Sequence, residues 1–120
     1  MLNLDTHLLV FTTLNQLTPE ERRLITMEDL AISDIVLWEL AMLTARGRVE
    51  VDFASPEFRL LYSRLRVIPI NLEIARMSAR LDFSSDPADE IIAATSVIER
   101  IPLLTRDRRI LKSRMVPFAK

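Results

Sequence analysis

The sequence contains no cysteine and only one glycine among its 120 residues. Without cysteine, a disulfide framework and a thiolate metal site are both excluded. Walker and Rossmann phosphate loops need several glycines, so P-loop kinases and dinucleotide-dependent dehydrogenases are excluded as well. His7 is the only histidine, and no serine or threonine has a histidine and an acid placed to activate it, which excludes serine hydrolases. Near a helix start, a lone histidine is usually structural; orienting a site group or shuttling a proton is the alternative.

Long hydrophobic runs and a basic N-terminal segment are also missing. No apolar run approaches the roughly 18 residues that a membrane span requires, and the first residues lack the positive charge of an export signal. Hydrophobic residues nevertheless make up 49% of the chain. That content is enough for one buried core, and the chain is too short for two ordinary domains. We therefore expect a single cytoplasmic domain spanning residues 1–120, with no membrane attachment.

Basic residues are not in excess, since 16 lysines and arginines face 17 acids and the net charge is -1 at pH 7. A generally basic surface for gripping nucleic acid is therefore not evident. The charges are segregated along the chain: residues 82–90 contain four acids and no base, whereas residues 101–120 contain six bases and one acid. Arginines outnumber lysines 14 to two. This suits forked contacts to phosphate or carboxylate, although a GC-rich coding sequence would give the same bias.

Helix and strand signals alternate along the chain. Capping residues followed by proline or acids mark helix starts at Thr18, Ser55, Asn71 and Asp86. The expected strands are 2–4, 30–33, 67–70 and 103–105, with 115–118 as a candidate edge strand, and the expected helices are 6–14, 19–27, 34–46, 56–65, 72–81 and 87–100. This order predicts an α/β fold, a three-layer α/β/α sandwich with a mostly parallel central sheet. Ligands of such sheets bind just beyond the carboxyl ends of the strands.

Glu39 is the most informative acid. It is the only ionisable residue between Asp34 and Arg46, and every residue three or four positions away from it is apolar. In a helix its carboxylate is therefore expected to be at least partly desolvated, which is costly unless a cation or a group of hydrogen-bond donors compensates. Functional sites are where such residues concentrate. The alternative is a surface glutamate on a narrow solvent-exposed stripe.

Three aspartates lie where strands end or a helix begins. Asp5 follows strand 2–4 and Asp107 follows strand 103–105, so both are expected at the ligand-binding edge of the sheet. Helix capping is the alternative for Asp5, and a turn aspartate paired with a neighbouring arginine is the alternative for Asp107. Asp89 comes three residues after Asp86, where a capping arrangement is again the alternative. Because Asp86 suffices as the cap, Asp89 is free for another role.

Four acids in one crevice would repel one another and raise their own pKa values unless a cation neutralises them. Carboxylate oxygens without cysteine or a histidine cluster favour Mg²⁺ or Mn²⁺ over Zn²⁺. Such an ion leaves coordination positions open for water and phosphate. The acids therefore predict metal-dependent hydrolysis of a phosphodiester.

Four short motifs resemble those of the PIN-domain family, and specifically its VapC-type toxins. The motifs are Leu4–His7, Leu37–Ala41, Asp86–Asp89 with Ile92–Thr95, and Leu104–Asp107. Each motif is weak alone, but together they occur in the right order over essentially the whole chain. The resemblance implies a parallel-sheet α/β/α fold and homodimers that bring two acidic sites near one another.

The resemblance also implies an activity and a site. The expected activity is that of a magnesium- or manganese-dependent endoribonuclease, the toxin of a type II toxin–antitoxin system, in which the carboxylate-bound ion activates water. The implied metal-binding and catalytic residues are Asp5, Glu39, Asp89 and Asp107, with Thr6 and Thr105 in supporting positions. The implied partners are the RNA substrate and an antitoxin whose tail lies over the acidic groove, often blocking it with a basic side chain.

Two positions depart from the family pattern. Many members carry histidine where this chain has Ser84, and a basic residue where it has Glu90. Both departures concern the positioning of substrate. The arginines that are candidates for phosphate contacts instead are Arg46, Arg48, Arg106, Arg108 and Arg109, of which we single out Arg106 and Arg108. Solvent exposure without a role is the alternative for each of them.

Two other functions remain open at this point. The first is a catalytically silent PIN-like module that dimerises and binds a partner through its acidic groove. The second is a phosphoryl-acceptor signalling domain, which also gathers aspartates at the carboxyl edge of a parallel sheet. That class needs an acid next to Asp5 and a late lysine near the site, whereas the only lysines here are Lys112 and Lys120. The signalling domain is therefore the weakest of the three hypotheses.

Overall fold

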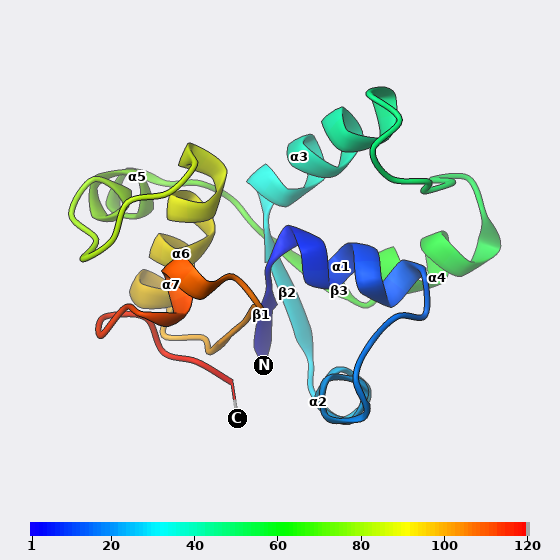
Figure 1. Ribbon diagram of the computed structural model, residues 1–120, viewed down its shortest axis with the longest axis horizontal. Helices are drawn as coiled ribbons and strands as arrows, with labels where there is room; N and C mark the ends of the chain where they lie inside the picture. Colours follow the sequence, from blue (N-terminus) through cyan, green and yellow to red (C-terminus); the bar gives the residue numbers. More distant parts are fainter. Residues whose placement is uncertain (120) are drawn as a thin grey trace.

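The structure, a computed structural model, describes residues 1–119, which form four strands and seven helices (Figure 1). The strands are β1 (Leu2–Leu4), β2 (Leu30–Ser33), β3 (Leu65–Ile68) and β4 (Leu103–Leu104). The helices are α1 (Thr6–Thr13), α2 (Pro19–Met27), α3 (Asp34–Ala45), α4 (Pro56–Ser63), α5 (Leu72–Ser78), α6 (Pro87–Glu99) and α7 (Arg108–Leu111).

The four strands form one sheet in the order β3-β2-β1-β4, and all three pairings are parallel. β1 lies in the middle, with Leu2 opposite Leu30 in β2 and Asn3 opposite Leu103 in β4. Since the strands are parallel, their carboxyl ends share one edge of the sheet. The predicted α/β fold with a parallel sheet is confirmed.

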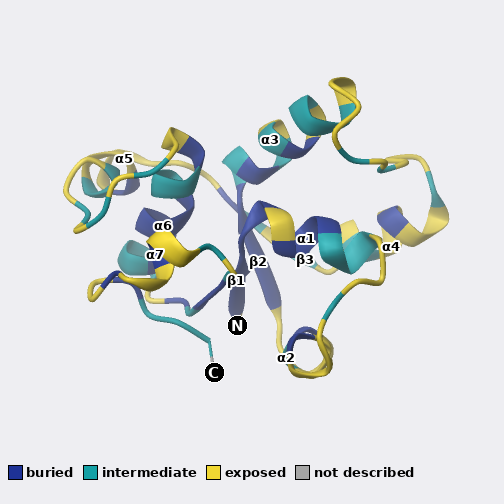
Figure 2. Cartoon of the chain, viewed as in Figure 1, coloured by how far each residue is buried: buried dark blue, intermediate teal, exposed yellow. Residues whose placement is uncertain are grey.

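Helices cover both faces of the sheet. In Figure 1, α5, α6 and α7 lie on one side of the strands and α1, α2 and α4 lie on the other. Every residue of β1, β2 and β4 is buried, because helices shield both faces of these strands, and Figure 2 shows this buried centre in dark blue. No helix within residues 1–119 is long and apolar enough to cross a bilayer.

Local sequence signals explain where the helices begin. Thr18 and Glu21 form a capping box at α2, in which the Thr18 hydroxyl accepts from the backbone N–H of Glu21 and the Glu21 carboxylate accepts from the backbone N–H of Thr18. Ser55 caps α4 and Asn71 caps α5 through their side chains. Asp86 takes the N-cap position of α6, but its side chain makes no capping hydrogen bond.

Several boundaries differ from the prediction. β3 begins at Leu65 rather than residue 67, because α4 ends early at Ser63 and Leu65 then pairs with Leu30 of β2. The candidate strand at 115–118 is reduced to one parallel bridge between Leu103 and Phe118. The helix α7 was not predicted at all. A four-residue helix has too little periodicity to be recognised in a sequence.

Candidate active site

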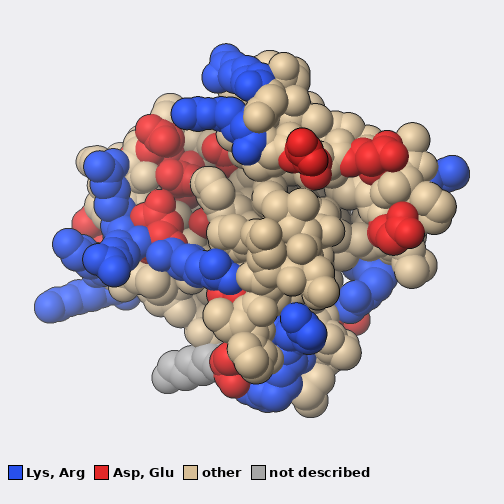
Figure 3. Space-filling view, turned by 45° about the vertical axis from the view of Figure 1, so that its right-hand side comes forward, with Lys and Arg blue, Asp and Glu red and all other residues tan. Residues whose placement is uncertain are grey.

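Three of the predicted acids lie just after a strand or in the helix that follows it, at the carboxyl edge of the sheet. Asp5 follows β1 directly, Glu39 lies in α3, which begins at the end of β2, and Asp107 lies between β4 and α7. Asp89 lies in the first turn of α6. Figure 1 shows the first turns of α1, α3 and α6 above the sheet at this edge. In Figure 3 acidic side chains gather in one region of the surface, bordered by lysines and arginines.

Asp5 is the most deeply buried of the acids, with 2% of its surface exposed. Its Oδ2 accepts a 2.6 Å hydrogen bond from the Thr105 hydroxyl, whereas its buried Oδ1 accepts no hydrogen bond of normal geometry from residues 1–119. Its side chain also makes no capping bond to α1, so capping does not explain it. A buried carboxylate oxygen without a partner is costly, which calls for a proton or a cation.

The pKa of Asp5 is raised, chiefly because burial penalises its charged form, with a smaller increase from the negative charge of Glu39. The hydrogen bond from Thr105, the electrostatic interaction with His7 and the N–H of Thr6 lower the pKa of Asp5 without cancelling the increase. Asp5 therefore holds a proton more tightly than a free aspartate does.

Glu39 is half-buried on α3 and is held by α1. The hydroxyl of the buried Thr6 donates a short hydrogen bond to Oε1 of Glu39. This contact joins the two helices at the point where both leave the sheet. Thr6 therefore fixes the direction of the Glu39 carboxylate, and the supporting role that the family resemblance implies for Thr6 stays a prediction.

Asp89 is half-buried, and the Ser85 hydroxyl donates a 2.8 Å hydrogen bond to its Oδ2. Its pKa is raised, first by burial and then by the negative charges of Asp5, Asp107 and Asp86, while the bond from Ser85 lowers it. These repulsions act on Asp89 from acids that are up to 84 positions away in the sequence. The fold thus brings Asp5, Asp89 and Asp107 close enough to feel one another's charge.

Asn3 helps to set the distance between β1 and α6. It is completely buried, and its Nδ2 donates to the carbonyl of Ile92 at 3.2 Å and to the Ser96 hydroxyl at 2.9 Å. Both partners lie on α6, the helix that carries Asp89, and Asn3 lies two residues before Asp5. This polar tie was not predicted, because no sequence signal links an asparagine to a helix 90 positions away.

Asp107 caps a helix, a role that was not predicted for it, and its charge still reaches another of the acids. Its Oδ1 caps α7 by accepting from the backbone N–H groups of Arg109 at 2.8 Å and Ile110 at 3.2 Å. Its negative charge nevertheless reaches Asp89. Capping therefore occupies Oδ1 and holds the carboxylate at the acidic edge of the sheet.

The donors at this edge suit a hard divalent cation, since they are carboxylate and hydroxyl oxygens. Among residues 1–119, two buried carboxylate oxygens have no hydrogen-bond partner, Oδ1 of Asp5 and Oδ1 of Asp34, which directly follows β2. Within residues 1–119, however, no three histidine or acidic side chains lie close enough together to form a ready-made metal cluster. The donor chemistry fits Mg²⁺ or Mn²⁺, and binding would require the carboxylates to draw closer.

Comparison with protein families matches residues 3–114 to the PIN domain. The chain belongs to the PIN-domain family. It is 30% identical to Ribonuclease VapC22 of Mycobacterium tuberculosis over 90 aligned residues. The alignment covers 72% of this chain and 69% of that protein. The resemblance to VapC-type proteins that the four motifs predicted is confirmed.

Solved structures support the same fold for this PIN domain. A toxin-antitoxin complex from Klebsiella pneumoniae aligns with a TM-score of 0.69 and 24% identity, over 93% of this chain and 91% of that chain. VapBC2 from Rickettsia felis, bound to a promoter DNA fragment, aligns with a TM-score of 0.72 and 18% identity, over 99% and 98% of the two chains. FitAcB from Neisseria gonorrhoeae aligns with a TM-score of 0.65 and 20% identity, over 100% and 97%.

Thr105 connects two of the acids in this PIN domain. Its hydroxyl donates to Oδ2 of Asp5 at 2.6 Å and accepts from the backbone N–H of Asp107 at 3.0 Å. If Asp5 is a metal ligand of a nuclease, replacing Thr105 by the similarly shaped valine is expected to lower the rate of RNA cleavage about 10–100-fold, the usual effect of losing a group that orients a metal ligand. Steady-state cleavage assays check this. Thr105→Ser, which keeps the hydroxyl, should retain activity within a few fold, and equal losses in both variants would contradict an orienting role.

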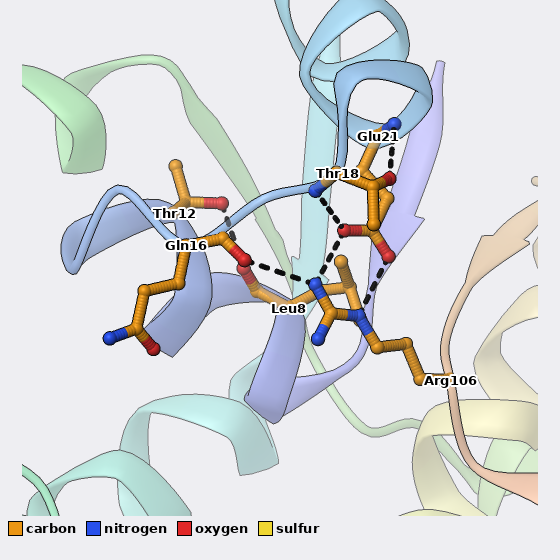
Figure 4. A network of polar contacts seen from close by, with 6 residues as sticks. All are labelled: Leu8, Thr12, Gln16, Thr18, Glu21 and Arg106. Atoms are coloured by element: carbon orange, nitrogen blue, oxygen red, sulfur yellow. Dashed lines mark hydrogen bonds and ion pairs between the residues drawn. The ribbon is translucent and has the colours of Figure 1, made fainter.

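The side chain of Arg106 is partly exposed and is held by an ion pair with Glu21 (Figure 4). Its Nε and Nη2 donate to the Glu21 carboxylate at 2.8 and 2.6 Å, and Nη2 also donates to the carbonyl of Gln16 at 3.1 Å. Its guanidinium lies 4.0 Å from the centre of the Phe11 ring. The phosphate contact predicted for Arg106 therefore competes with an internal ion pair, whereas Arg108 is exposed in the first turn of α7.

Sequence reasoning missed two polar residues around the PIN-domain acids. Glu21 was recognised only as part of a capping box, although its carboxylate also binds Arg106. Ser85, rather than Ser84, contacts Asp89. Its position four residues before Asp89, just outside the start of α6, was the available signal. The exposed Ser84 and the half-buried Glu90, whose carboxylate accepts from the backbone N–H of Ser85, surround the same helix start.

Proposed function

We propose that this PIN domain is a divalent-cation-dependent endoribonuclease. The observation that carries the proposal is the buried Asp5, whose Oδ1 has no hydrogen-bond partner within residues 1–119 and which lies within range of the charges of Glu39 and Asp89. A protein that needed these acids only for stability would gain by replacing them. Kinship with a ribonuclease supports RNA as the substrate.

Each acid has its own part in this proposal. Asp5, Glu39, Asp89 and Asp107 would hold Mg²⁺ or Mn²⁺. When bound, that ion supplies Lewis-acid chemistry that favours ionisation of water and neutralises charge on the phosphate. Thr105 keeps Oδ2 of Asp5 fixed, and Oδ1 is the oxygen that would bind the ion. Thr6 fixes Glu39 in the same way, which leaves its second oxygen to bind the ion or take a proton.

We further propose that the protein acts in the cytoplasm as the toxin of a toxin–antitoxin pair and forms a homodimer. The proposal is supported by fold likeness to a toxin-antitoxin complex and to VapBC2. The acidic edge of the sheet suits an antitoxin segment with a basic side chain, because a guanidinium or ammonium group would neutralise the same carboxylates as a metal ion.

The experiment that tests the activity uses two aspartates from the same helix turn. Purified protein is expected to cut single-stranded RNA in Mg²⁺ or Mn²⁺, to stop when EDTA is added, and to resume when excess Mn²⁺ is restored. Asp89→Asn should remove the activity. Asp86→Asn, a matched control at the exposed N-cap position, should stay within about threefold of wild type.

The possible outcomes separate three explanations. Cleavage that survives both EDTA and Asp89→Asn would indicate a contaminating nuclease and leave this chain without activity of its own. Absence of cleavage and of metal binding in the wild type would favour the silent partner-binding module. Equal loss in the two variants would show that general charge, and not the position of Asp89, matters.

A further inference from the structure

A groove runs between α1 and α3 and leads away from the acidic edge of the sheet. Its volume is about 460 Å³. Apolar side chains of the two helices line it, among them Val10, Phe11, Leu14 and Leu43, and the polar residues that line it are His7 and Arg48. No acid lines the groove.

The groove begins at the level of the proposed active site. His7 lies in the first turn of α1, two residues after Asp5, and Leu43 lies one turn beyond Glu39 on the same face of α3. From His7 to Leu14 the helix rises about 10 Å. This length matches about three stacked nucleotides at about 3.4 Å each. A strand cut at the acids therefore has room to continue along the groove.

Charge distinguishes this groove from its neighbours. One neighbouring cavity, between α1 and α4, is lined by Glu50, Asp52 and Glu57, and another, beyond the end of α3, is lined by Glu50 and Asp52. Both would repel a phosphate backbone. The α1–α3 groove offers a histidine and an arginine to phosphates and an apolar wall with an aromatic ring to bases, as single-strand binding sites do.

The Phe11 ring in the groove wall is already held in place. The guanidinium of Arg106 lies over it at 4.0 Å and is itself fixed by Glu21. A fixed aromatic side chain loses little conformational entropy when a base packs on the groove. The wall is therefore prepared for a planar, apolar group.

We infer that the α1–α3 groove is the subsite for the nucleotides that flank the cleaved phosphodiester. In this arrangement their bases pack on Phe11 and Leu43, and a backbone phosphate contacts Arg48. This inference rests on the proposed ribonuclease function and adds to it the path of the RNA strand.

The test compares two exposed arginines that are two positions apart. Arg48 lines the groove and Arg46 does not, and both are exposed, so neither substitution threatens folding. Arg48→Glu is expected to raise the KM for a fluorescein-labelled single-stranded RNA about tenfold, with kcat within threefold. Arg46→Glu should change KM less than twofold. Anisotropy titrations at several salt concentrations, in a Glu39→Gln background, should show the log–log salt slope reduced by about 0.7–1 for Arg48→Glu.

Each outcome decides one point. If wild type cleaves RNA but Arg48→Glu has an unchanged KM and salt slope, the subsite is wrong and the ribonuclease function stands. If wild type neither cleaves nor binds RNA, the proposed function itself fails. If Arg46→Glu and Arg48→Glu weaken RNA binding equally, the overall charge of the protein determines binding, and this result would also contradict the subsite. If Arg48→Glu no longer co-purifies with a co-expressed antitoxin but binds RNA as wild type does, the groove binds a protein partner and the subsite is wrong.

Discussion

Asp5→Asn is expected to reduce RNA cleavage on the order of 10³-fold, about 4 kcal/mol of transition-state stabilisation. The reason is that Asp5 is almost completely buried and its Oδ1 has no hydrogen-bond partner among residues 1–119. Asparagine has nearly the same shape and keeps an oxygen for the Thr105 hydroxyl, but it lacks the charge that would hold a cation. Single-turnover cleavage assays with excess enzyme measure this loss directly.

The same substitution should stabilise the metal-free protein. Because the folded-state pKa of Asp5 is raised, ionisation of Asp5 weakens folding as pH rises above the ordinary aspartate pKa of about 3.9. At pH 7 in EDTA, Asp5→Asn should therefore raise Tm by about 4 °C, or about 1 kcal/mol. Near pH 3 the difference should vanish. Asp29→Asn, at an exposed position, should change neither activity nor Tm, and a lower Tm for Asp5→Asn would contradict this account.

The second large loss of activity is expected when the ion pair between Arg106 and Glu21 is broken. Arg106 lies between Thr105 and Asp107, so its bond to Glu21 fixes the loop that carries both site residues. Arg106→Gln is expected to lower kcat/KM about 10–100-fold. It should also cost about 1–2 kcal/mol of stability, since it leaves Glu21 buried with fewer donors, and water on the exposed side of the pair limits the loss.

A double-mutant cycle distinguishes this positioning role from the phosphate contact predicted from the sequence. If the pair positions the loop, Glu21→Gln should lower kcat/KM nearly as much as Arg106→Gln, and the double variant should lose little more. If Arg106 binds phosphate, Arg106→Gln should raise KM while Glu21→Gln leaves activity near that of wild type.

The pair also makes a prediction for pH. The hydrogen bond from Arg106 is the largest cause that lowers the pKa of Glu21, so the stability it contributes is present above the ordinary glutamate pKa of about 4.3 and is lost as pH falls below it. Urea unfolding between pH 7 and pH 3 should show a smaller pH dependence in Glu21→Gln than in wild type.

Much of this fold was predictable because its determinants are local. The caps at Thr18, Ser55 and Asn71 lie within three residues of the N–H groups they satisfy. Short apolar strands that alternate with helices leave few topologies other than a parallel sheet. The boundary of β3 was misplaced because its start depends on pairing with β2, which is a tertiary contact.

The acids of the site were predictable for a different reason. Parallel topology brings residues that follow strands to one edge, which was enough to select Asp5 and Asp107, and an apolar helix made Glu39 conspicuous. The contacts that orient them join residues far apart in the sequence, as with Asn3 and Ser96 or Glu21 and Arg106. No periodicity or motif encodes such pairs, so they became known only from the structure.

The central claim is that these carboxylates tolerate one another in the working protein because a divalent ion lies among them. The most direct test is the melting temperature of wild type and Asp5→Asn during titration with MnCl₂. Wild type should be stabilised progressively, by about 2.7 kcal/mol at a hundred times the Kd, while Asp5→Asn should shift little. A wild-type Tm that does not respond to Mn²⁺ or Mg²⁺, or an equal response in both proteins, would contradict the claim.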